Sequence, residues 1–367
     1  MSRLLVVTND FPTRRGGIES FVLALCERLP ADEVVVYTAA MPGDTEYDAS
    51  LPFPVHRDPR RILLPTPAVA RRVGRALRDG SCDRVLLGAS APLGLLAPAL
   101  RRAGARRIVG LTHGHEVWWA RVPGSRRLLR RIGDSVDVLT YVSDWCRDRI
   151  APALSPEARS RMVRLSPGVH PDRFFPGCGG AGIRSRLGIG ADTPVVVCTA
   201  RMVRRKGQDT LVRCWPEVLR SMPDALLLLV GDGPARPRLE ALVDELGVRA
   251  SVLLTGSVDW ADVPAYTDAG DVFAMPCRTR WWGLQPEAWG IVLLEAQACG
   301  LPVVVGRSGG APETVLDPAR ARVLDRDGDV ATALVELLGQ RRRRVAGDAV
   351  VRWTWSAAAD RLASLWR

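Results

Sequence analysis

The stretch Val195–Gly207 reads VVVCTARMVRRKG. Residues Val195–Thr199 are apolar or β-branched without alternation, which is typical of a strand buried on both faces of a parallel sheet. Polar and cationic residues follow at once, and Gly207 opens a helical pattern. This order predicts one unit of a doubly wound α/β sheet, in which ligands bind at the carboxyl ends of the strands.

The same order of strand, turn and helix repeats along both halves of the chain. The predicted strands are Leu4–Thr8, Val34–Thr38, Arg84–Gly88, Ile108–Thr112, Val138–Val142, Met162–Leu165, Val195–Thr199, Leu226–Val230, Val252–Thr255, Val272–Met275 and Pro302–Val305. A segment rich in Gly and Pro separates the halves and predicts a linker. We therefore expect two Rossmann-like parallel-sheet domains facing across a cleft. They would cover 1–170 and 191–352, with a linker at 171–190 and a helix at 353–367 that packs back on the first domain.

Composition narrows the class of protein. The chain has 367 residues, 47% of them apolar, which is enough for two cores. It has no apolar run long enough to span a bilayer, and the strand at Leu4–Thr8 is followed by polar residues rather than by a signal-peptide pattern. The eight cysteines include no C-x-x-C pair, which argues against a zinc site and a disulfide framework. We expect a cytoplasmic protein.

The net charge of +11 is uneven, because residues 1–170 carry +9 of it. Such a lobe favours an anionic partner: nucleic acid, an anionic membrane or an acidic substrate. The chain has no nucleic-acid-binding motif. The segment 57–78 combines arginines with apolar residues, which predicts a basic amphipathic surface able to lie on a membrane. An ordinary solvated helix face is an equally good interpretation of the same pattern.

Lys206 is the only lysine beside 50 arginines. A bias toward arginine would tend to replace every lysine that arginine can substitute, so we expect that a compact ammonium is needed at this position; chance survival of one lysine is the alternative. Arg201 and Lys206 follow a strand and precede a helix, where two cations can hold a diphosphate. A solvated basic turn is the alternative, since Arg204 and Arg205 lie there too.

Two carboxylates lie eight residues apart in Glu287–Gly300, EAWGIVLLEAQACG. Glu295 falls inside an apolar helix, where an unpaired charge is unfavourable unless it binds something. Glu287 falls just before that helix, so the pair could hold two ends of one extended polar ligand. A bridge from Glu295 to an arginine is the alternative.

Polar residues also follow strands in the first half. Gly16 and Gly17 allow a ligand to approach the start of a helix, although a plain turn explains them as well. They do not form G-x-G-x-x-G, so a nicotinamide cofactor is poorly supported. His113 and His115 in Thr112–Glu116 (THGHE) lack a zinc spacing, and we interpret them as substrate contacts.

These motifs together resemble glycosyltransferase family 4, the retaining enzymes of the GT-B fold. The likeness covers nearly the whole chain and includes Gly231–Pro234 (GDGP) and Gly309–Glu313 (GGAPE). Within the family, the chain is most similar to actinobacterial phosphatidylinositol mannosyltransferases. Ala288 and Trp289 stand where family members commonly have Gly and Phe, and the preceding loop, with Trp281 and Trp282, is unusually aromatic.

The resemblance implies a retaining mannosyl transfer from GDP-mannose to a phosphatidylinositol mannoside at the inner membrane surface, without a metal or other cofactor. Catalytic roles are implied for Arg201, Lys206, Glu287, His113 and Asp10. Donor-binding roles are implied for Gly16, Gly17, Arg201, Lys206, Gly231, Glu287, Gly290, Ile291, Val292 and Glu295. Arg201 and Lys206 would hold the diphosphate, Glu295 the ribose, and Glu287 and His113 the transferred sugar, with Asp10 near the acceptor hydroxyl.

Two other enzyme classes fit the sequence. One is transfer from a UDP- or GDP-sugar to a soluble acceptor, which keeps the fold and changes the substrates. The other is a sugar-nucleotide epimerase of the same fold, which would turn over the donor without an acceptor. We expect a nucleotide-sugar donor, a glycolipid acceptor and an anionic membrane as partners, and no nucleic acid. The sequence says nothing of the oligomeric state.

Overall fold

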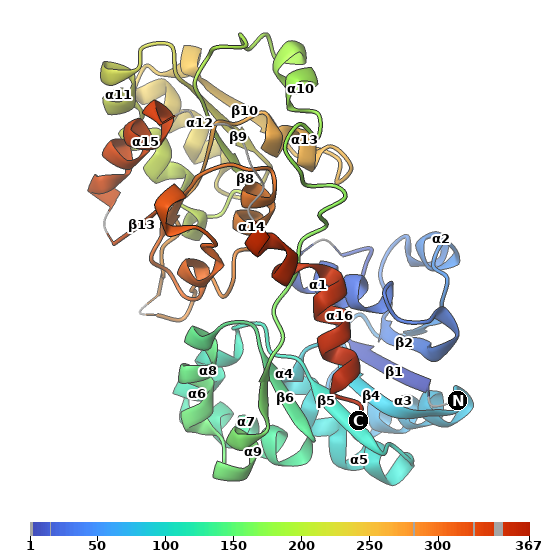
Figure 1. Ribbon diagram of the computed structural model, residues 1–367. Coiled ribbons are helices and arrows are strands. Elements are labelled where there is room, and N and C mark those ends of the chain that lie inside the picture. Colours follow the sequence, from blue (N-terminus) through green and yellow to red (C-terminus); the bar gives the residue numbers. More distant parts are fainter. Residues whose placement is uncertain (1–2, 15, 282, 326, 341–347) are drawn as a thin grey trace. The chain divides into compact units, whose positions relative to one another are not determined.

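The computed structural model describes residues 3–14, 16–281, 283–325, 327–340 and 348–367 (Figure 1). The chain divides into two compact units. The first contains residues 1–167 and 355–367, and the second contains residues 168–354. Each has its own parallel sheet, as the sequence predicts.

The first unit is built on a seven-stranded parallel sheet in the order β3-β2-β1-β4-β5-β6-β7. The strands are β1 (Arg3–Thr8), β2 (Val34–Ala39), β3 (Val55–Asp58), β4 (Cys82–Leu87), β5 (Arg107–Gly110), β6 (Val138–Tyr141) and β7 (Met162–Arg164). The helices are α1 (Gly17–Cys26), α2 (Asp44–Ala49), α3 (Pro67–Asp79), α4 (Ser90–Leu93), α5 (Ala97–Ala103), α6 (Glu116–Arg121), α7 (Pro123–Ser135), α8 (Asp144–Ile150), α9 (Pro156–Ser160) and α16 (Trp355–Ser364).

The second unit has a six-stranded parallel sheet in the order β10-β9-β8-β11-β12-β13. The strands are β8 (Val195–Thr199), β9 (Leu226–Val230), β10 (Val252–Gly256), β11 (Val272–Met275), β12 (Val303–Gly306) and β13 (Ala321–Leu324). The helices are α10 (Gly180–Arg186), α11 (Gln208–Ser221), α12 (Arg236–Glu245), α13 (Val263–Asp268), α14 (Ile291–Ala298) and α15 (Val330–Gly339).

The sequence predicts all the central strands, and also the edge strands β7 and β10. All five residues of β8 are buried, because helices cover both faces of a doubly wound sheet. Two further strands, β3 and β13, lie at the sheet edges and were not predicted. Each has three residues that are only half-buried or exposed, and the sequences VHRD and ARVL contain no apolar run. An edge strand needs less apolar sequence because one side of it has no neighbouring strand.

Residues 171–190, predicted as a linker, instead contain α10 and belong to the second unit. Gly180 begins this helix against α13, where an added Cβ would lie 2.4 Å from the carbonyl oxygen of Asp268. The glycines of this segment therefore serve close packing as well as turns. The boundary between the units falls between Pro167 and Gly168.

The last helix, α16, belongs to the first unit and lies beside α1 (Figure 1). The rings of Phe21 and Trp355 are 5.7 Å apart between centroids. Arg107 donates a hydrogen bond to the carbonyl oxygen of Leu365 at 2.9 Å. Among the described residues, no helix is both long enough and apolar enough to cross a bilayer.

Candidate active site

The turn after β8 places Lys206 against Glu287. Lys206 ends a short 3₁₀ helix, η4 (Arg204–Lys206), and Gly207 follows with φ +81°. An added Cβ at Gly207 would lie 2.1 Å from the carbonyl oxygen of Pro276, so only glycine fits. Lys206 Nζ lies 2.7 Å from Glu287 Oε2, and both side chains are about nine-tenths buried.

The ionised state of Glu287 depends on this pairing. Burial acts to raise its pKa, but the positive charges of Lys206 and Arg205 outweigh burial and hold the pKa below its ordinary value. Arg205 Nε lies 3.6 Å from the same carboxylate oxygen. Glu287 is therefore a carboxylate near neutral pH, able to accept hydrogen bonds from hydroxyl groups.

The main chain of Glu287 is fixed by the segment after β12. Its N–H donates to Ser308 Oγ at 3.1 Å, and its carbonyl accepts from the N–H of Gly310 at 2.9 Å. Gly309 has φ +58°, and an added Cβ there would lie 2.1 Å from the Glu287 carbonyl. No role for Ser308 was predicted, because only the fold brings its hydroxyl to the N–H of Glu287.

Glu295 is a buried carboxylate in α14. The residue is 3% exposed, and within the described part of the chain its carboxylate has no hydrogen bond or ion pair. Burial raises its pKa to about 7, opposed by the charges of Arg173 and Lys206. The predicted bridge to an arginine is thus absent from these contacts. An unpaired buried acceptor is suited to a ligand that brings hydroxyl donors.

The start of α14 can also bind a ligand. Gly290 adopts φ +91° and precedes Ile291 and Val292, whose side chains are half-buried. The first N–H groups of a helix have no carbonyl partner within it, and they attract anions and ring oxygens. Glu287 and Gly290 therefore lie on the segment that leads into α14, and Glu295 lies within this helix.

Glycines after β9 allow the main chain to approach the turn that holds Arg201. Gly231 has φ +130°, and an added Cβ would lie 2.4 Å from the carbonyl oxygen of Ala200. Gly233 has φ +154°, and an added Cβ there would lie 2.5 Å from the carbonyl oxygen of Met202. The Arg201 side chain is exposed and has no partner within the described residues. It is available to bind an anion.

The unusual tryptophans have different surroundings. Trp289 is 4% exposed, and its ring centroid lies 5.0 Å from that of Trp353 within the same unit. It therefore packs against the segment that leads out of the second unit and does not present its face to a sugar. Trp281 is 61% exposed. Trp282 lies outside the described residues.

In the first unit, Asp10 and the glycine pair follow β1. The N–H of Asp10 donates to Thr8 Oγ1 at 2.9 Å, and Arg14 Nη1 lies 3.6 Å from Asp10 Oδ1. An added Cβ at Gly16 would lie 2.3 Å from Glu19 Oε2, whereas a Cβ at Gly17 would meet no atom within 4 Å. A side chain at Gly16 would therefore displace only the end of the Glu19 side chain, and Gly17 leaves open space.

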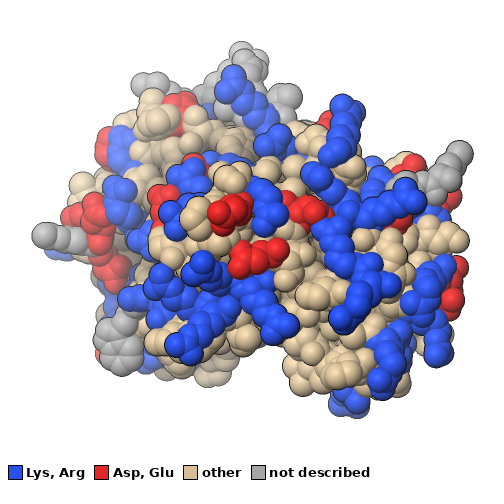
Figure 2. Space-filling model, turned by 90° about the horizontal axis from the view of Figure 1, so that it is seen from below, with Lys and Arg blue, Asp and Glu red and all other residues tan. Residues whose placement is uncertain are grey.

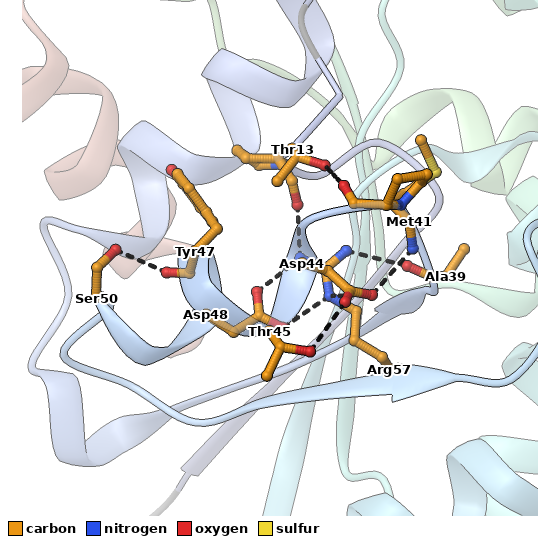
Figure 3. A network of polar contacts seen from close by, with 11 residues as sticks. Thr13, Ala39, Met41, Asp44, Thr45, Tyr47, Asp48, Ser50 and Arg57 are labelled. Carbon is orange, nitrogen blue, oxygen red and sulfur yellow. Dashed lines mark hydrogen bonds and ion pairs between the residues drawn. The ribbon is translucent and has the colours of Figure 1, made fainter.

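Arg57 holds the chain that precedes these glycines (Figure 3). Its Nη2 donates to the carbonyl oxygen of Pro12 at 2.6 Å, and its Nη1 donates to that of Ala39 at 3.0 Å. Nε and Nη2 also donate to the two carboxylate oxygens of Asp48 at 2.8 and 2.6 Å. The prediction that Arg57 belongs to an exposed basic surface is wrong, because its side chain is nearly buried. A guanidinium has five donors, and here they join three chain segments.

His113 follows β5 and is held by the chain after β4. Its Nε2 lies 2.6 Å from the carbonyl oxygen of Gly88. A carbonyl only accepts, so Nε2 carries the proton and Nδ1 is left as an acceptor for a hydroxyl group. Burial lowers the pKa of His113, which favours the neutral ring. Asp10 lies close enough for its charge to oppose this shift.

Glu116 orients the His113 loop, a role that the sequence did not reveal. It is fully buried, and its Oε2 accepts hydrogen bonds from the N–H groups of His113 and Gly114 at 3.0 and 3.1 Å. His115 Nε2 lies 3.2 Å from its other oxygen and 3.2 Å from the carbonyl oxygen of Ala91. The ring of His115 thus contacts other groups of the protein. The sequence signal that could have revealed the role of Glu116 is its place directly after the segment with the two histidines.

The structure therefore gathers the predicted residues in two groups. Lys206 and Glu287 are in contact, and Glu295 lies within the electrostatic reach of Lys206, all in the second unit. Asp10 and His113 interact in the first unit. Within the described ranges, no group of three or more His, Cys, Asp or Glu side chains could hold a metal ion.

A buried carboxylate beside a lysine at the carboxyl ends of parallel strands could bind the hydroxyl and phosphate groups of a nucleotide sugar. Residues 15–173 match the family described as Glycosyltransferase Family 4, and residues 182–344 match the family described as Glycosyl transferases group 1. The chain belongs to glycosyltransferase family 4.

Its relatives narrow the comparison. The chain is 48% identical to the GDP-mannose-dependent alpha-(1-6)-phosphatidylinositol monomannoside mannosyltransferase of Mycolicibacterium smegmatis, over 99% of this chain and 97% of the relative. It is 44% identical to the Mycobacterium tuberculosis protein of that name, over 100% and 98%. HepE from Anabaena, solved with UDP, shares the fold at a TM-score of 0.83 and 19% identity, with 99% of each chain covered.

Proposed function

We propose that this glycosyltransferase moves a mannosyl residue from GDP-mannose to a phosphatidylinositol monomannoside. The identity of 48% over nearly the full length of a mannosyltransferase that uses these substrates carries this proposal. The buried Glu295 supports it, because a nucleoside ribose supplies the two hydroxyl donors that this carboxylate lacks.

The residues of each unit divide the reaction between them. Arg201 and Lys206 bind the diphosphate, and they stabilise the negative charge that grows as the bond between the sugar carbon and the phosphate oxygen breaks. Glu287 accepts hydrogen bonds from the hydroxyls of the transferred sugar. In the first unit, His113 Nδ1 is the acceptor that we assign to a sugar hydroxyl.

The acceptor hydroxyl forms the new bond to the sugar carbon while the donor bond breaks. Its proton passes to the leaving phosphate, and GDP departs. In this scheme, the anomeric configuration of the sugar is retained. The charge of the leaving group is met by side chains, and no metal or other cofactor takes part. Asp10 lies near the acceptor hydroxyl in this scheme.

The acceptor is a lipid, so we propose that the first unit contacts an anionic membrane at the inner face of the cell membrane. The predicted surface over 57–78 needs correction, because Val69, Val73 and Leu77 of α3 are buried in the core and Arg72 pairs with the buried Asp58. Only the turn before α3 keeps the expected character. Ile62 and Leu64 are 58% and 52% exposed there, beside the exposed Arg60 and Arg61.

A second exposed surface of this kind lies on α6 and α7. Its apolar side chains are Trp118, Val122 and Leu128, and its arginines are Arg127, Arg130 and Arg131. Figure 2 shows the molecule from the side on which α5, α7 and α9 lie in Figure 1, and arginine side chains crowd that face. Exposed aromatic and apolar tips among arginines suit the interface of an anionic bilayer.

The test is transfer of radiolabelled mannose from GDP-mannose to phosphatidylinositol monomannoside in vesicles. Product that carries one more mannose supports the proposal. Transfer from UDP-glucose but not from GDP-mannose would overturn the donor, and transfer to free inositol in preference to the lipid would overturn the acceptor. Consumption of donor without acceptor would indicate an epimerase instead.

A further inference from the structure

Two cysteines that the proposed reaction does not use lie in contact in the second unit. Cys178 Sγ and Cys299 Sγ are 3.8 Å apart, although 121 positions separate them in the sequence. Cys299 follows the last residue of α14 and is fully buried, whereas Cys178 is half-buried between exposed glycines. The sulfur of Cys178 is thus open to a small oxidant. The sulfur of Cys299 is the one with which oxidised Cys178 would react next.

The chain around Cys178 is held in place. Asp268 accepts hydrogen bonds from the N–H groups of Gly177 and Gly180 at 3.0 and 2.7 Å, and the Cys178 thiol contacts the carbonyl oxygen of Pro264 at 3.4 Å. These contacts bind the loop to α13 on both sides of the cysteine. The loop that carries Cys178 is therefore held beside α13, where its sulfur lies 3.8 Å from that of Cys299.

The pair also has the chemistry of a reactive dithiol. The hydrogen bond between the two thiols lowers the pKa of Cys178 to about 7, which favours its reactive thiolate form. Cys214 is half-buried as well, but its sulfur donates to the carbonyl oxygen of Leu211, and burial raises its pKa to about 12. The five remaining cysteines are buried.

We propose that Cys178 and Cys299 form an oxidisable pair that closes to an intramolecular disulfide and weakens donor binding. With a peroxide as oxidant, Cys178 sulfur bonds to one peroxide oxygen, the O–O bond breaks and water leaves, which gives a sulfenic acid. Cys299 sulfur then bonds to Cys178 sulfur, the S–O bond breaks, and the hydroxyl leaves with the Cys299 proton as a second water. Two thiols are oxidised as one peroxide is reduced.

The effect on the donor follows from the position of Cys299. Its N–H donates to the carbonyl oxygen of Glu295 at 3.1 Å, so Cys299 caps the last turn of α14, in which Glu295 lies. A disulfide requires the sulfurs to move from 3.8 Å to about 2.05 Å apart. Because Asp268 restrains the Cys178 loop, part of that movement falls on the end of α14 and displaces Glu295. This consequence rests on the proposed function.

The experiment treats the reduced protein with hydrogen peroxide, blocks remaining thiols with N-ethylmaleimide and maps the products by mass spectrometry. We expect two fewer thiols and a cross-linked peptide that joins Cys178 to Cys299. The matched control Cys214→Ser should form the same cross-link, whereas Cys299→Ser should stop at oxidised Cys178. A cross-link to any other cysteine, or intact thiols at both positions, would overturn the proposal.

Affinity for GDP is then compared by calorimetry. The oxidised protein should bind GDP several-fold more weakly than the reduced protein, and dithiothreitol should restore the affinity. Equal affinity of the two forms would overturn the effect on the donor. Failure of the reduced protein to bind GDP would instead count against the proposed function, because the mapping of the disulfide needs no ligand.

Discussion

The ammonium group of Lys206 lies 2.7 Å from Glu287 Oε2, in a chain that otherwise uses arginine for every basic side chain. The two residues come from the turn after β8 and the segment before α14. Their pairing joins the group proposed to bind the diphosphate to the group proposed to bind the sugar, and the charge of Lys206 helps to keep Glu287 ionised.

The identity of this cation should matter more than its charge. Lys206→Arg keeps a positive charge but places a planar guanidinium in a site whose side chain is nearly nine-tenths buried. We expect a loss of kcat of roughly a hundredfold, equivalent to about 3 kcal/mol of transition-state stabilisation. The exposed neighbour offers a control, because Arg204→Lys should leave mannosyl transfer unchanged. Full activity of Lys206→Arg would remove the argument for a compact ammonium.

The raised pKa of Glu295 predicts a pH dependence of nucleotide binding. Hydroxyl donors stabilise the carboxylate, so GDP affinity should fall as the pH drops through about 7 and the residue takes up a proton. Below pH 7, binding should release a proton, which calorimetry in two buffers of different ionisation enthalpy measures. A GDP affinity that does not change between pH 6 and pH 8 would contradict this assignment.

The titration of Glu295 should affect folding stability in the opposite direction: stability falls with rising pH, whereas GDP affinity rises. Because the folded pKa exceeds the ordinary value, the folded state favours the protonated form, and stability should decrease as the pH rises from 4.5 to about 7. Glu295→Gln removes this titration. Melting temperatures from pH 5 to pH 8 should therefore fall less in Glu295→Gln than in the wild type, and parallel curves would show that Glu295 is not the group responsible.

Glu116 should act as a positioning residue for His113. Glu116→Ala leaves the N–H groups of His113 and Gly114 without their acceptor, at about 1–3 kcal/mol for each buried donor. We expect a lower melting temperature and a larger loss in kcat than in GDP affinity, since GDP is proposed to bind the second unit. Glu157→Ala, on the exposed side of α9, is the control. An equal loss of GDP affinity would indicate a general structural defect.

Arg57 should stabilise the loop that leads to Gly16. Arg57→Lys cannot serve both main-chain carbonyls and both oxygens of Asp48, so we expect the melting temperature to fall by several degrees. The comparison is Arg60→Lys, because Arg60 is exposed. If the two variants melt alike, the network in Figure 3 does not stabilise the loop.

The α6–α7 surface should bind vesicles that contain phosphatidylinositol. The double variant Trp118→Ser, Leu128→Ser should sediment with such vesicles several-fold less than the wild type, and 0.5 M salt should weaken binding of both. Phe175→Ser provides the control, because Phe175 is 43% exposed in the second unit. Wild-type sedimentation of the double variant would place the membrane contact elsewhere, with the turn at Ile62 and Leu64 as the next surface to test.

Much of the fold was predictable from local sequence. The strands in the sheet interiors, such as β8 and β9, are continuous apolar runs because they are covered on both faces, and that pattern is visible without a structure. Of the four edge strands, β3 and β13 were missed, because VHRD and ARVL have no apolar run, and a strand with one open side tolerates such a sequence. The glycine- and proline-rich segment 171–190 misled for a related reason, since close packing and flexible turns both select glycine.

The sequence by itself determined the class of fold, the importance of Lys206 and the presence of an acidic residue inside an apolar helix. These follow from periodicity and from composition, which are properties of the chain alone. Only the tertiary structure decided which charges meet: that Lys206 pairs with Glu287, that Glu295 is left without a partner, that Arg57 points inward and that Cys178 reaches Cys299. Contacts between side chains depend on distances across the fold, and parallel strands bring together residues whose separation in sequence carries no such information.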